Sequence, residues 1–223
     1  DCKDVLSVQV HPDDTVARSH GLPRGKTEAW FVVDCEEGAG VYLGTQEGVS
    51  GQDLLEVVAA GGGDQAVRDA LRFIEVTPGD TLLVPAGSVH AIGPGLVLFE
   101  VQQNSDTTYR IYDWGRGRPV HIKESKDALL DHPQLDPIQR ETSGDHWTLL
   151  LDDPAFAVMR ARPDHPLSLQ PRHRFCTLTV LAGQGHLAQG DTTLPLVPGD
   201  TALVLAEVSI EGDGLDLLAI QPT

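Results

Sequence analysis

The segment Pro78-Gly79-Asp80-Thr81-Leu82-Leu83-Val84-Pro85-Ala86 indicates the fold of this chain better than any other stretch. A Pro-Gly-Asp turn precedes an apolar run that stops at a proline, a pattern typical of a short buried strand. The pattern returns 120 residues later as Pro198-Gly199-Asp200-Thr201-Ala202-Leu203-Val204-Leu205-Ala206. Upstream, Val32–Gly44 aligns with Leu178–Gly190 at an offset of 146 residues. We interpret the second half as a degenerate copy of the first.

The two offsets differ by 26 residues, about the size of a helical insertion in the first copy alone. Ser50–Ala60 and Asp64–Arg72 carry apolar residues at helical spacing, separated by the breaker Gly61–Gly63. We therefore predict a first unit over residues 1–130 with a helical insertion at about 50–72. A linker follows over 131–145, and a degenerate second unit without metal ligands covers 146–223.

The rest of the chain reads as short strands separated by Gly, Pro and Asp, which is typical of an all-β barrel or sandwich. A shorter helix is expected over Ser125–Leu130. The predicted strands include Trp30–Asp34, Gly40–Gly44, Leu82–Pro85, Leu96–Val101, Phe175–Leu181 and Ala202–Leu205.

Composition excludes several classes of protein. The chain has 223 residues, 40% of them hydrophobic, and 33 acidic against 16 basic residues give a formal charge of −17. A surface this acidic repels polyphosphate, and no apolar run approaches the ~20 residues that cross a bilayer, so neither nucleic acid nor membrane is an expected partner. Cys2, Cys35 and Cys176 lack metal-ligand spacing and suggest reduced thiols in a cytoplasmic protein. The chain begins at Asp1 with a strand pattern close behind, so we expect it to be part of something longer; the oligomeric state is not defined.

Candidate metal ligands concentrate in the first copy. The alternation in Leu6-Ser7-Val8-Gln9-Val10-His11 places Ser7, Gln9 and His11 on one face of a strand. Glu28 lies near the start of another strand, and His90 follows a turn. Two imidazoles, a carboxylate and an amide oxygen suit Zn²⁺, with Mn²⁺, Fe²⁺, Co²⁺ and Ni²⁺ as alternatives. On spacing alone, each histidine is as well explained as a hydrogen-bonded core residue.

Four ordered motifs carry a family resemblance. The segments QVHPDD (9–14), GKTEAW (25–30), VPAGSVHAIG (84–93) and EVQQNSDTTYRIYDW (100–114) resemble the type I phosphomannose isomerases, particularly their shorter bacterial branch, which belong to the cupin superfamily. The resemblance implies a double cupin of two jelly-roll β-barrels and an enzyme that interconverts mannose 6-phosphate and fructose 6-phosphate. It also implies one Zn²⁺ per chain, held by Gln9, His11, Glu28 and His90.

The same resemblance assigns the remaining site residues and a phosphorylated hexose as substrate. It implies Lys26, Glu100, Asp106 and Arg110 around the sugar, and Ser7, Arg110 and Arg116 towards the phosphate. The reaction moves a proton from C2 to C1 through a cis-enediol, for which a carboxylate is a suitable base. Glu100 is the first candidate, and Lys26 or Asp106 would shuttle the ring-opening proton. Arg118, in the same Gly-rich loop, is expected to be an ordinary solvated charge.

Alternatives stay open at this point. Lys26 and Glu28 would equally form a surface ion pair, and Asp106 would equally cap a turn. The chain lacks an N-terminal segment that the family carries, so a non-catalytic sugar-binding or regulatory double cupin is the competing function. A cupin oxygenase is less favoured, because such enzymes use histidine-rich ligand sets.

The second copy is expected to hold no metal. At the offset of 146, Lys26 and Glu28 fall on Arg172 and Arg174, and at 120, His90 falls on Ile210. A guanidinium group and an aliphatic side chain cannot rebuild the ligand set.

Overall fold

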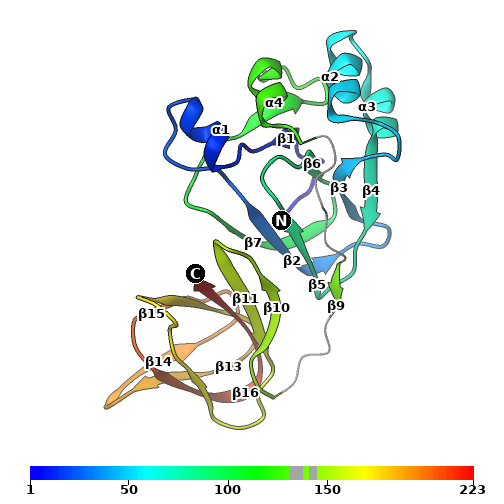
Figure 1. The fold of residues 1–223 in the computed structure, drawn as a ribbon. Coiled ribbons are helices and arrows are strands. Elements are labelled where there is room, and N and C mark those ends of the chain that lie inside the picture. Colours follow the sequence, from blue (N-terminus) through cyan, green and yellow to red (C-terminus); the bar gives the residue numbers. More distant parts are fainter. Residues whose placement is uncertain (131–137, 141–144) are drawn as a thin grey trace. The chain divides into compact units, whose positions relative to one another are not determined.

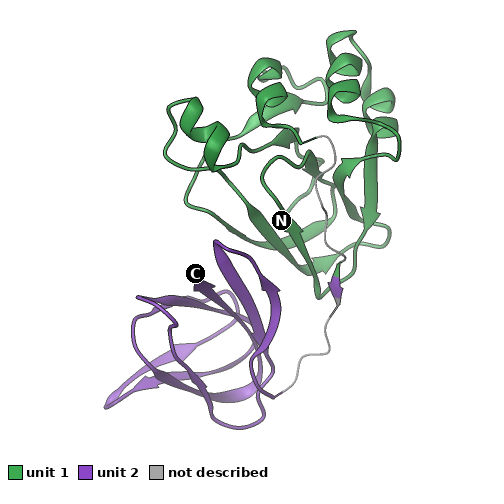
Figure 2. Cartoon of the chain, in the orientation of Figure 1, with its two compact units in different colours: residues 1–138 green, residues 139–223 purple. Residues whose placement is uncertain are grey.

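The structure is a computed structural model that describes residues 1–130, 138–140 and 145–223. These residues divide into two compact units, Asp1–Ile138 and Gln139–Thr223 (Figure 2). Strands dominate both units, which confirms the all-β prediction. The division falls inside the segment expected as a linker, most of which, at 131–137 and 141–144, lies outside the described residues.

Unit 1 contains two antiparallel sheets and four helices (Figure 1). Five strands form one sheet in the order β4-β3-β6-β1-β8, and β7-β2-β5 form the other. The elements are β1 (Val8–Val10), α1 (Asp14–Ser19), β2 (Glu28–Cys35), β3 (Gly40–Thr45), α2 (Gly51–Ala59), α3 (Asp64–Ala70), β4 (Leu71–Glu75), β5 (Asp80–Val84), β6 (His90–Ile92), β7 (Leu96–Gln102), β8 (Tyr109–Tyr112) and α4 (Ile122–Ala128).

Two hydrophobic clusters define the layers of unit 1. The first lies between the sheets and includes Trp30 from β2 and Leu82 from β5. The second covers the outer face of the larger sheet, where Leu54 of α2 and Val67 of α3 belong to one cluster with Ile111 of β8. Helices α2 and α3 thus occupy the stretch where apolar spacing predicts an insertion, and α2 begins with a capping box of Ser50 and Asp53. The expected helix near 125–130 is α4, which begins three residues earlier.

Strand β1 divides its side chains between these layers. Val8 and Val10 belong to the helix-covered cluster and are fully buried. Because side chains alternate along a strand, Gln9 faces the space between the sheets, as the sequence pattern predicts. Leu6 departs from the pattern, since it is 39% exposed.

Unit 2 is a single seven-stranded sheet that bends around its own core. Its path is β10-β11-β16-β13-β14, with β12 paired to β16 and β15 paired to β13. The long strands bend where Gly183 and Gly214, both with positive φ, meet: a Cβ on Gly183 would lie 2.3 Å from the Gly214 carbonyl oxygen. The strands of this sheet are β10 (Thr148–Asp152), β11 (Phe156–Ala161), β12 (Leu167–Leu169), β13 (Cys176–Gln189), β14 (Thr192–Leu196), β15 (Thr201–Val204) and β16 (Val208–Pro222); the two-residue β9 (Gln139–Arg140) is not part of it.

The two Pro-Gly-Asp turns make equivalent contacts. Gly79 donates its N–H to Val32 O at 2.8 Å, and Gly199 donates to Val180 O at 2.9 Å. Each aspartate accepts a backbone N–H from the residue three positions earlier. Val32 therefore corresponds to Val180, an offset of 148 rather than the 146 read from the sequence.

The pairing of β5 and β15 corrects the residues expected to replace Glu28 and Lys26. Glu28 lies opposite Val84, and Cys176 lies opposite Val204, 120 residues after Val84. The equivalent of Glu28 is thus Cys176, not Arg174, and that of Lys26 is Arg174, not Arg172. The sequence alignment slipped by two residues because a two-residue shift preserves the alternation of inward and outward side chains.

The described helices are short, and the cysteines are unpaired. None of the helices in these parts of the chain is long and apolar enough to cross a membrane. Cys2, Cys35 and Cys176 are all free thiols, and Cys176 is fully buried in unit 2.

Candidate metal centre

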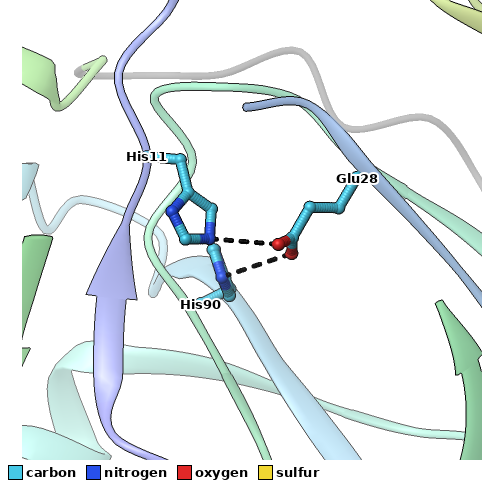
Figure 3. A group of neighbouring side chains, drawn as sticks. All are labelled: His11, Glu28 and His90. Carbon is cyan, nitrogen blue, oxygen red and sulfur yellow. Dashed lines mark ion pairs between the residues drawn. The ribbon is translucent and has the colours of Figure 1, made fainter. Parts of the chain in front are cut away.

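Three of the expected ligands meet between the sheets of unit 1 (Figure 3). The Nε2 atom of His11 lies 3.2 Å from one carboxylate oxygen of Glu28, and Nε2 of His90 lies 3.7 Å from the other. All three side chains are at most 2% exposed. Gln9 joins them, with its Nε2 3.2 Å from Nε2 of His90. Residues from β1, β2 and β6 are thus brought together.

The outer ring nitrogens decide which nitrogen of each histidine, when the ring is neutral, presents a lone pair to Glu28. Nδ1 of His11 lies 2.8 Å from Thr107 O, and Nδ1 of His90 lies 2.9 Å from Ser88 O. A carbonyl only accepts, so each Nδ1 carries the proton and the neutral ring has a free electron pair on Nε2. Two lone pairs directed at a carboxylate repel it unless a proton or a cation lies between them.

This arrangement fits a divalent metal ion. The Nε2 atom of His11 is buried and makes no hydrogen bond to any part of the chain that the structure describes. Carbonyl acceptors that orient a ligating imidazole through its far nitrogen are a regular feature of metal sites. The donor set of two imidazoles and one carboxylate suits a first-row transition metal.

Burial keeps His90 unprotonated and, by itself, opposes the ionisation of Glu28. For His90, burial lowers the pKa to about 4, aided by the neighbouring His11, so the ring is neutral near pH 7. Burial by itself would raise the pKa of Glu28. Lys26, together with His11 and His90 whenever those rings are protonated, outweighs burial and holds that pKa well below its usual range. Both groups are therefore in the forms that bind metal.

The turn after β1 brings Lys26 to the same centre. Asp13 caps α1 by accepting the N–H groups of Thr15 and Val16. The chain then returns so closely that a Cβ on Gly25 would lie 2.5 Å from the carbonyl carbon of Asp13. Lys26 N donates to Pro12 O at 3.0 Å, and its ammonium lies 2.5 Å from Glu28. The Lys26–Glu28 ion pair exists, but it is buried rather than on the surface.

Glu100 lies beside this pair. Glu100 of β7 lies opposite Trp30 of β2, and Trp30 follows Glu28 by two residues on that strand. Glu100 as a whole is exposed, yet its carboxyl group is partly withdrawn from water beside Glu28. Burial first, and then the negative charge of Glu28, raises its pKa to about 7, which Lys26 partly opposes. Glu100 therefore reaches both solvent and the centre.

Arg110 lies on the same inner face as the metal ligands. Gln9 pairs with His90 on one side and with Arg110 on the other. Residues directly opposite across a sheet share a face, so Arg110 is two strands from His90, about 10 Å by the usual strand spacing. Its Nη1 donates to Pro119 O at 2.8 Å, while its buried Nε donates no hydrogen bond to the described residues.

The other residues expected in the site are placed less centrally. Ser7 is buried, with Oγ 3.5 Å from Gln9 Oε1. Asp106 is exposed in the loop between β7 and β8. The guanidinium group of Arg116 is already bound to two backbone carbonyls. It donates to Asp113 O at 3.0 Å and to Val5 O at 2.8 Å.

Sequence reasoning missed three kinds of contributor. Trp30 is fully buried and meets the ring of His90 edge-on, with centroids 5.5 Å apart. The carbonyls of Ser88 and Thr107 orient the histidines, but any residue has a carbonyl, so the sequence carries no signal for them. Asp113 binds Arg118 through both carboxylate oxygens, which corrects the expectation that Arg118 is merely solvated. The position of Asp113 between Arg110 and Arg116 in the sequence was the signal that could have indicated this role.

A second group of potential ligands lies in unit 2. Ligand atoms of Asp145, Asp164 and His165 lie within 4.8 Å of one another, but all three residues are exposed. None of them is at a position equivalent to Glu28 or His90. His165 lies 3.4 Å from Asp145, and this contact is explained by an ordinary surface ion pair.

Comparison with known proteins gives several matches, although no model of a protein family matches the chain. Mannose-6-phosphate isomerase of Streptococcus mutans is 38% identical over 208 residues, 90% of this chain and 64% of that protein. ManA of Bacillus subtilis, also a mannose-6-phosphate isomerase, is 35% identical over 220 residues, 93% of this chain and 68% of its own. The chain thus spans about two thirds of these relatives.

A solved structure shows the same fold. The crystal structure of mannose 6-phosphate isomerase from Bacillus subtilis matches with a TM-score of 0.83 and 29% identity. The match covers 98% of this chain and 72% of the other. It confirms the cupin-type β fold; the two complete jelly-roll barrels stay a prediction.

Proposed function

Since the chain belongs to the mannose-6-phosphate isomerase family, we propose that it interconverts mannose 6-phosphate and fructose 6-phosphate through a cis-enediol. One observation carries the proposal beyond family membership. His11 and His90 direct Nε2, which carries a lone pair in the neutral ring, at Glu28 in a buried space, with Gln9, Lys26, Glu100 and Arg110 around it. A sugar-binding module has no need of this arrangement.

We assign Zn²⁺ to His11, Glu28 and His90, with Gln9 as a fourth ligand. A half-turn of the Gln9 amide exchanges its nitrogen for its oxygen beside His90, which supplies the donor atom. Such an ion, when bound, polarises the oxygens on C1 and C2 of a sugar as negative charge develops. Two imidazoles, a carboxylate and an amide oxygen support zinc among the divalent metals.

Glu100 is the proposed base. Its carboxylate removes the proton from C2; the electrons of that bond form the C1–C2 double bond, and the C1 oxygen gains a proton. Return of the proton to C1, with loss of the proton from the C2 oxygen, gives the ketose. Glu100 suits this role because it borders the centre and still reaches solvent. Lys26, bound to Glu28, and Asp106, on the exposed loop, are the candidates that move the ring-opening proton.

Arg110, Arg116 and Ser7 are proposed to receive the phosphate. Arg110 shares the inner face with Gln9 and has a buried Nε–H that makes no hydrogen bond to the described residues, which makes it the strongest of the three. A guanidinium pairs well with phosphate oxygens because its fork of donors matches their geometry. The strongly acidic chain needs such short-range contacts to hold a dianion.

An assay of the chain as it stands tests the function. Conversion of mannose 6-phosphate to fructose 6-phosphate is measured by coupled detection of the ketose, with the protein loaded with Zn²⁺ and after chelation. Turnover that requires the metal is expected. Binding of the sugar phosphate without turnover by the metal-loaded protein would instead favour a sugar-binding protein. The cytoplasmic location expected from the cysteines stays a prediction.

A further inference from the structure

Asp113 lies at the centre of three arginines directly after β8. It is only 5% exposed, and both of its carboxylate oxygens face guanidinium groups. Arg118 binds it through Nη2 at 2.5 Å and Nε at 2.9 Å, and Arg116 Nη2 lies 3.3 Å away. Arg110 Nε is 3.9 Å from the same oxygen. One carboxylate thus faces three positive charges, and the exposed Asp4, 3.8 Å from Arg116, leaves a local excess of one.

The loop that carries Asp113 contains a residue with a strained backbone conformation. Trp114 has a φ of 53°, a left-handed conformation that is unfavourable for a residue with a side chain. Its indole N–H donates to Leu6 O at 2.7 Å, and Arg68 of α3 stacks over its ring at 4.5 Å. Arg118 N donates to Asp113 Oδ2 at 3.0 Å. These contacts fix the carboxylate of Asp113 relative to β1 and the helical insertion.

Arg110 is the arginine with spare capacity. The guanidinium group of Arg118 donates to the Asp113 carboxylate, and that of Arg116 donates to Asp113 O and Val5 O. Arg110 keeps a buried Nε–H that makes no hydrogen bond to any described residue, and it lies beside Gln9 on the inner face. A buried, charged donor without an acceptor costs free energy, which an anionic ligand would recover.

We propose that Asp113 is a positioning residue: it holds the guanidinium group of Arg110 in the orientation that receives the substrate phosphate. Asp113 touches no substrate itself and acts through Arg110. The inference rests on the proposed function for the identity of the anion, and it adds a residue that the family resemblance does not assign.

The direction in which one substitution changes phosphate binding separates a positioning role from simple electrostatics. Asp113→Asn removes a negative charge from the anion site, so electrostatics alone would tighten the binding of a phosphate. If Asp113 positions Arg110, the same substitution weakens binding, because the guanidinium group loses the fixed charge that orients it. The two accounts therefore predict opposite changes.

Calorimetric titration of the zinc-loaded protein with glucitol 6-phosphate, which cannot isomerise, and with unphosphorylated glucitol provides the test. For Asp113→Asn we expect about tenfold weaker binding of the phosphorylated probe, no change for glucitol, and an equal rise in KM for mannose 6-phosphate. Zinc content measured by elemental analysis shows that unit 1 is still folded. Asp113→Glu, which keeps the charge but displaces it, should also weaken binding and serves if the asparagine variant is unstable.

Two further variants complete the design. In an Arg110→Ala background, Asp113→Asn should add little to the loss, because the residue through which it acts is already absent. Asp216→Asn is the matched control, since Asp216 is also held by two arginines but lies in unit 2. It should leave binding of the phosphorylated probe unchanged.

The outcomes distinguish the two proposals. Unchanged or tighter binding in Asp113→Asn overturns the positioning role, whether or not the protein isomerises sugars. Weaker binding in that variant, with no turnover by the wild-type protein, overturns the proposed function and supports the positioning role. Full additivity with Arg110→Ala shows that Asp113 does not act through Arg110 and overturns the inference.

Discussion

In unit 1, the strand opposite β5 carries Glu28, whereas in unit 2 the strand opposite β15 carries Cys176 at the equivalent position. A second substitution follows from the same register. Glu100 lies opposite Trp30 in unit 1, and Ala219 lies opposite Leu178 in unit 2. Two carboxylates of the candidate centre have thus been replaced by a thiol and a methyl group.

The positions of two further candidate ligands, Gln9 and His90, are also apolar in unit 2. Gln9 lies opposite His90 in unit 1, and Leu167 lies opposite Ile210 in unit 2. Ile210 is fully buried and Cys176 belongs to the same apolar cluster. The same pairing scheme therefore accepts either a polar centre that needs a cation or a continuous hydrophobic core. The fold does not require the chemistry; the side chains at these positions decide it.

The largest effect should come from removing the metal. Chelation should reduce isomerisation at least about a thousandfold, because the ion supplies several kcal/mol of charge stabilisation in the transition state. It should also lower the unfolding temperature of unit 1, since bound metal stabilises only the folded state, and leave unit 2 unchanged. Calorimetry with elemental analysis checks both. Full activity in metal-free protein would remove the basis of the comparison.

Placing a carboxylate in unit 2 tests its apolar centre. Cys176→Glu should lower the free energy of unfolding by about 3–5 kcal/mol, because the site lacks the imidazoles that face Glu28 in unit 1 and because Arg174, at the position of Lys26, is exposed. Urea unfolding measures the change. Cys176→Ala, which only leaves a small cavity, should cost about 1 kcal/mol. A glutamate variant as stable as the alanine variant would mean that unit 2 retains polar partners at this position.

A buried ion pair in unit 2 should be revealed by acid. Arg160 binds Asp216 through Nε at 2.9 Å and Nη2 at 2.7 Å, and Arg162 adds a third contact at 3.0 Å. Burial opposes ionisation of Asp216, but these arginines outweigh it and lower its pKa.

Because that pKa is lower in the folded state, the contribution to stability is complete above the ordinary aspartate value, near 4, and is lost as pH falls towards the folded pKa. Asp216→Asn should cost about 2–3 kcal/mol at pH 7 and remove this part of the acid dependence. Urea unfolding of both proteins from pH 7 to pH 3 tests it. An identical acid dependence in the two proteins would assign it to other carboxylates.

The smallest effect is expected at Arg116, which belongs to the charged loop of unit 1. Arg116→Ala should raise KM for mannose 6-phosphate about tenfold and leave any activity on unphosphorylated mannose unchanged. Steady-state kinetics with both sugars checks the prediction. Equal losses on the two sugars would show that Arg116 serves the loop, through Val5 and Asp113, rather than the phosphate.

Several features of the site were predictable because they depend on local pattern. The two-residue alternation around Gln9 placed it on the inner face, and the spacing of apolar residues predicted α2 and α3. The repeat was visible because its Pro-Gly-Asp turns are set by local backbone geometry. The offset between β2 and β13 was misread, since a shift of two residues leaves every inward side chain inward.

The sequence by itself determined the fold class, the insertion, the family resemblance and the residue types available for a metal centre. Only the tertiary structure decided how those residues meet: the carbonyls of Thr107 and Ser88 orient the two histidines, Lys26 is buried against Glu28, and Asp113 gathers the arginines. The physical reason is the sequence separation over which each kind of interaction acts. Turn and strand preferences act over a few residues, whereas hydrogen bonds between residues 11 and 107, or 5 and 116, exist only after the sheets have paired.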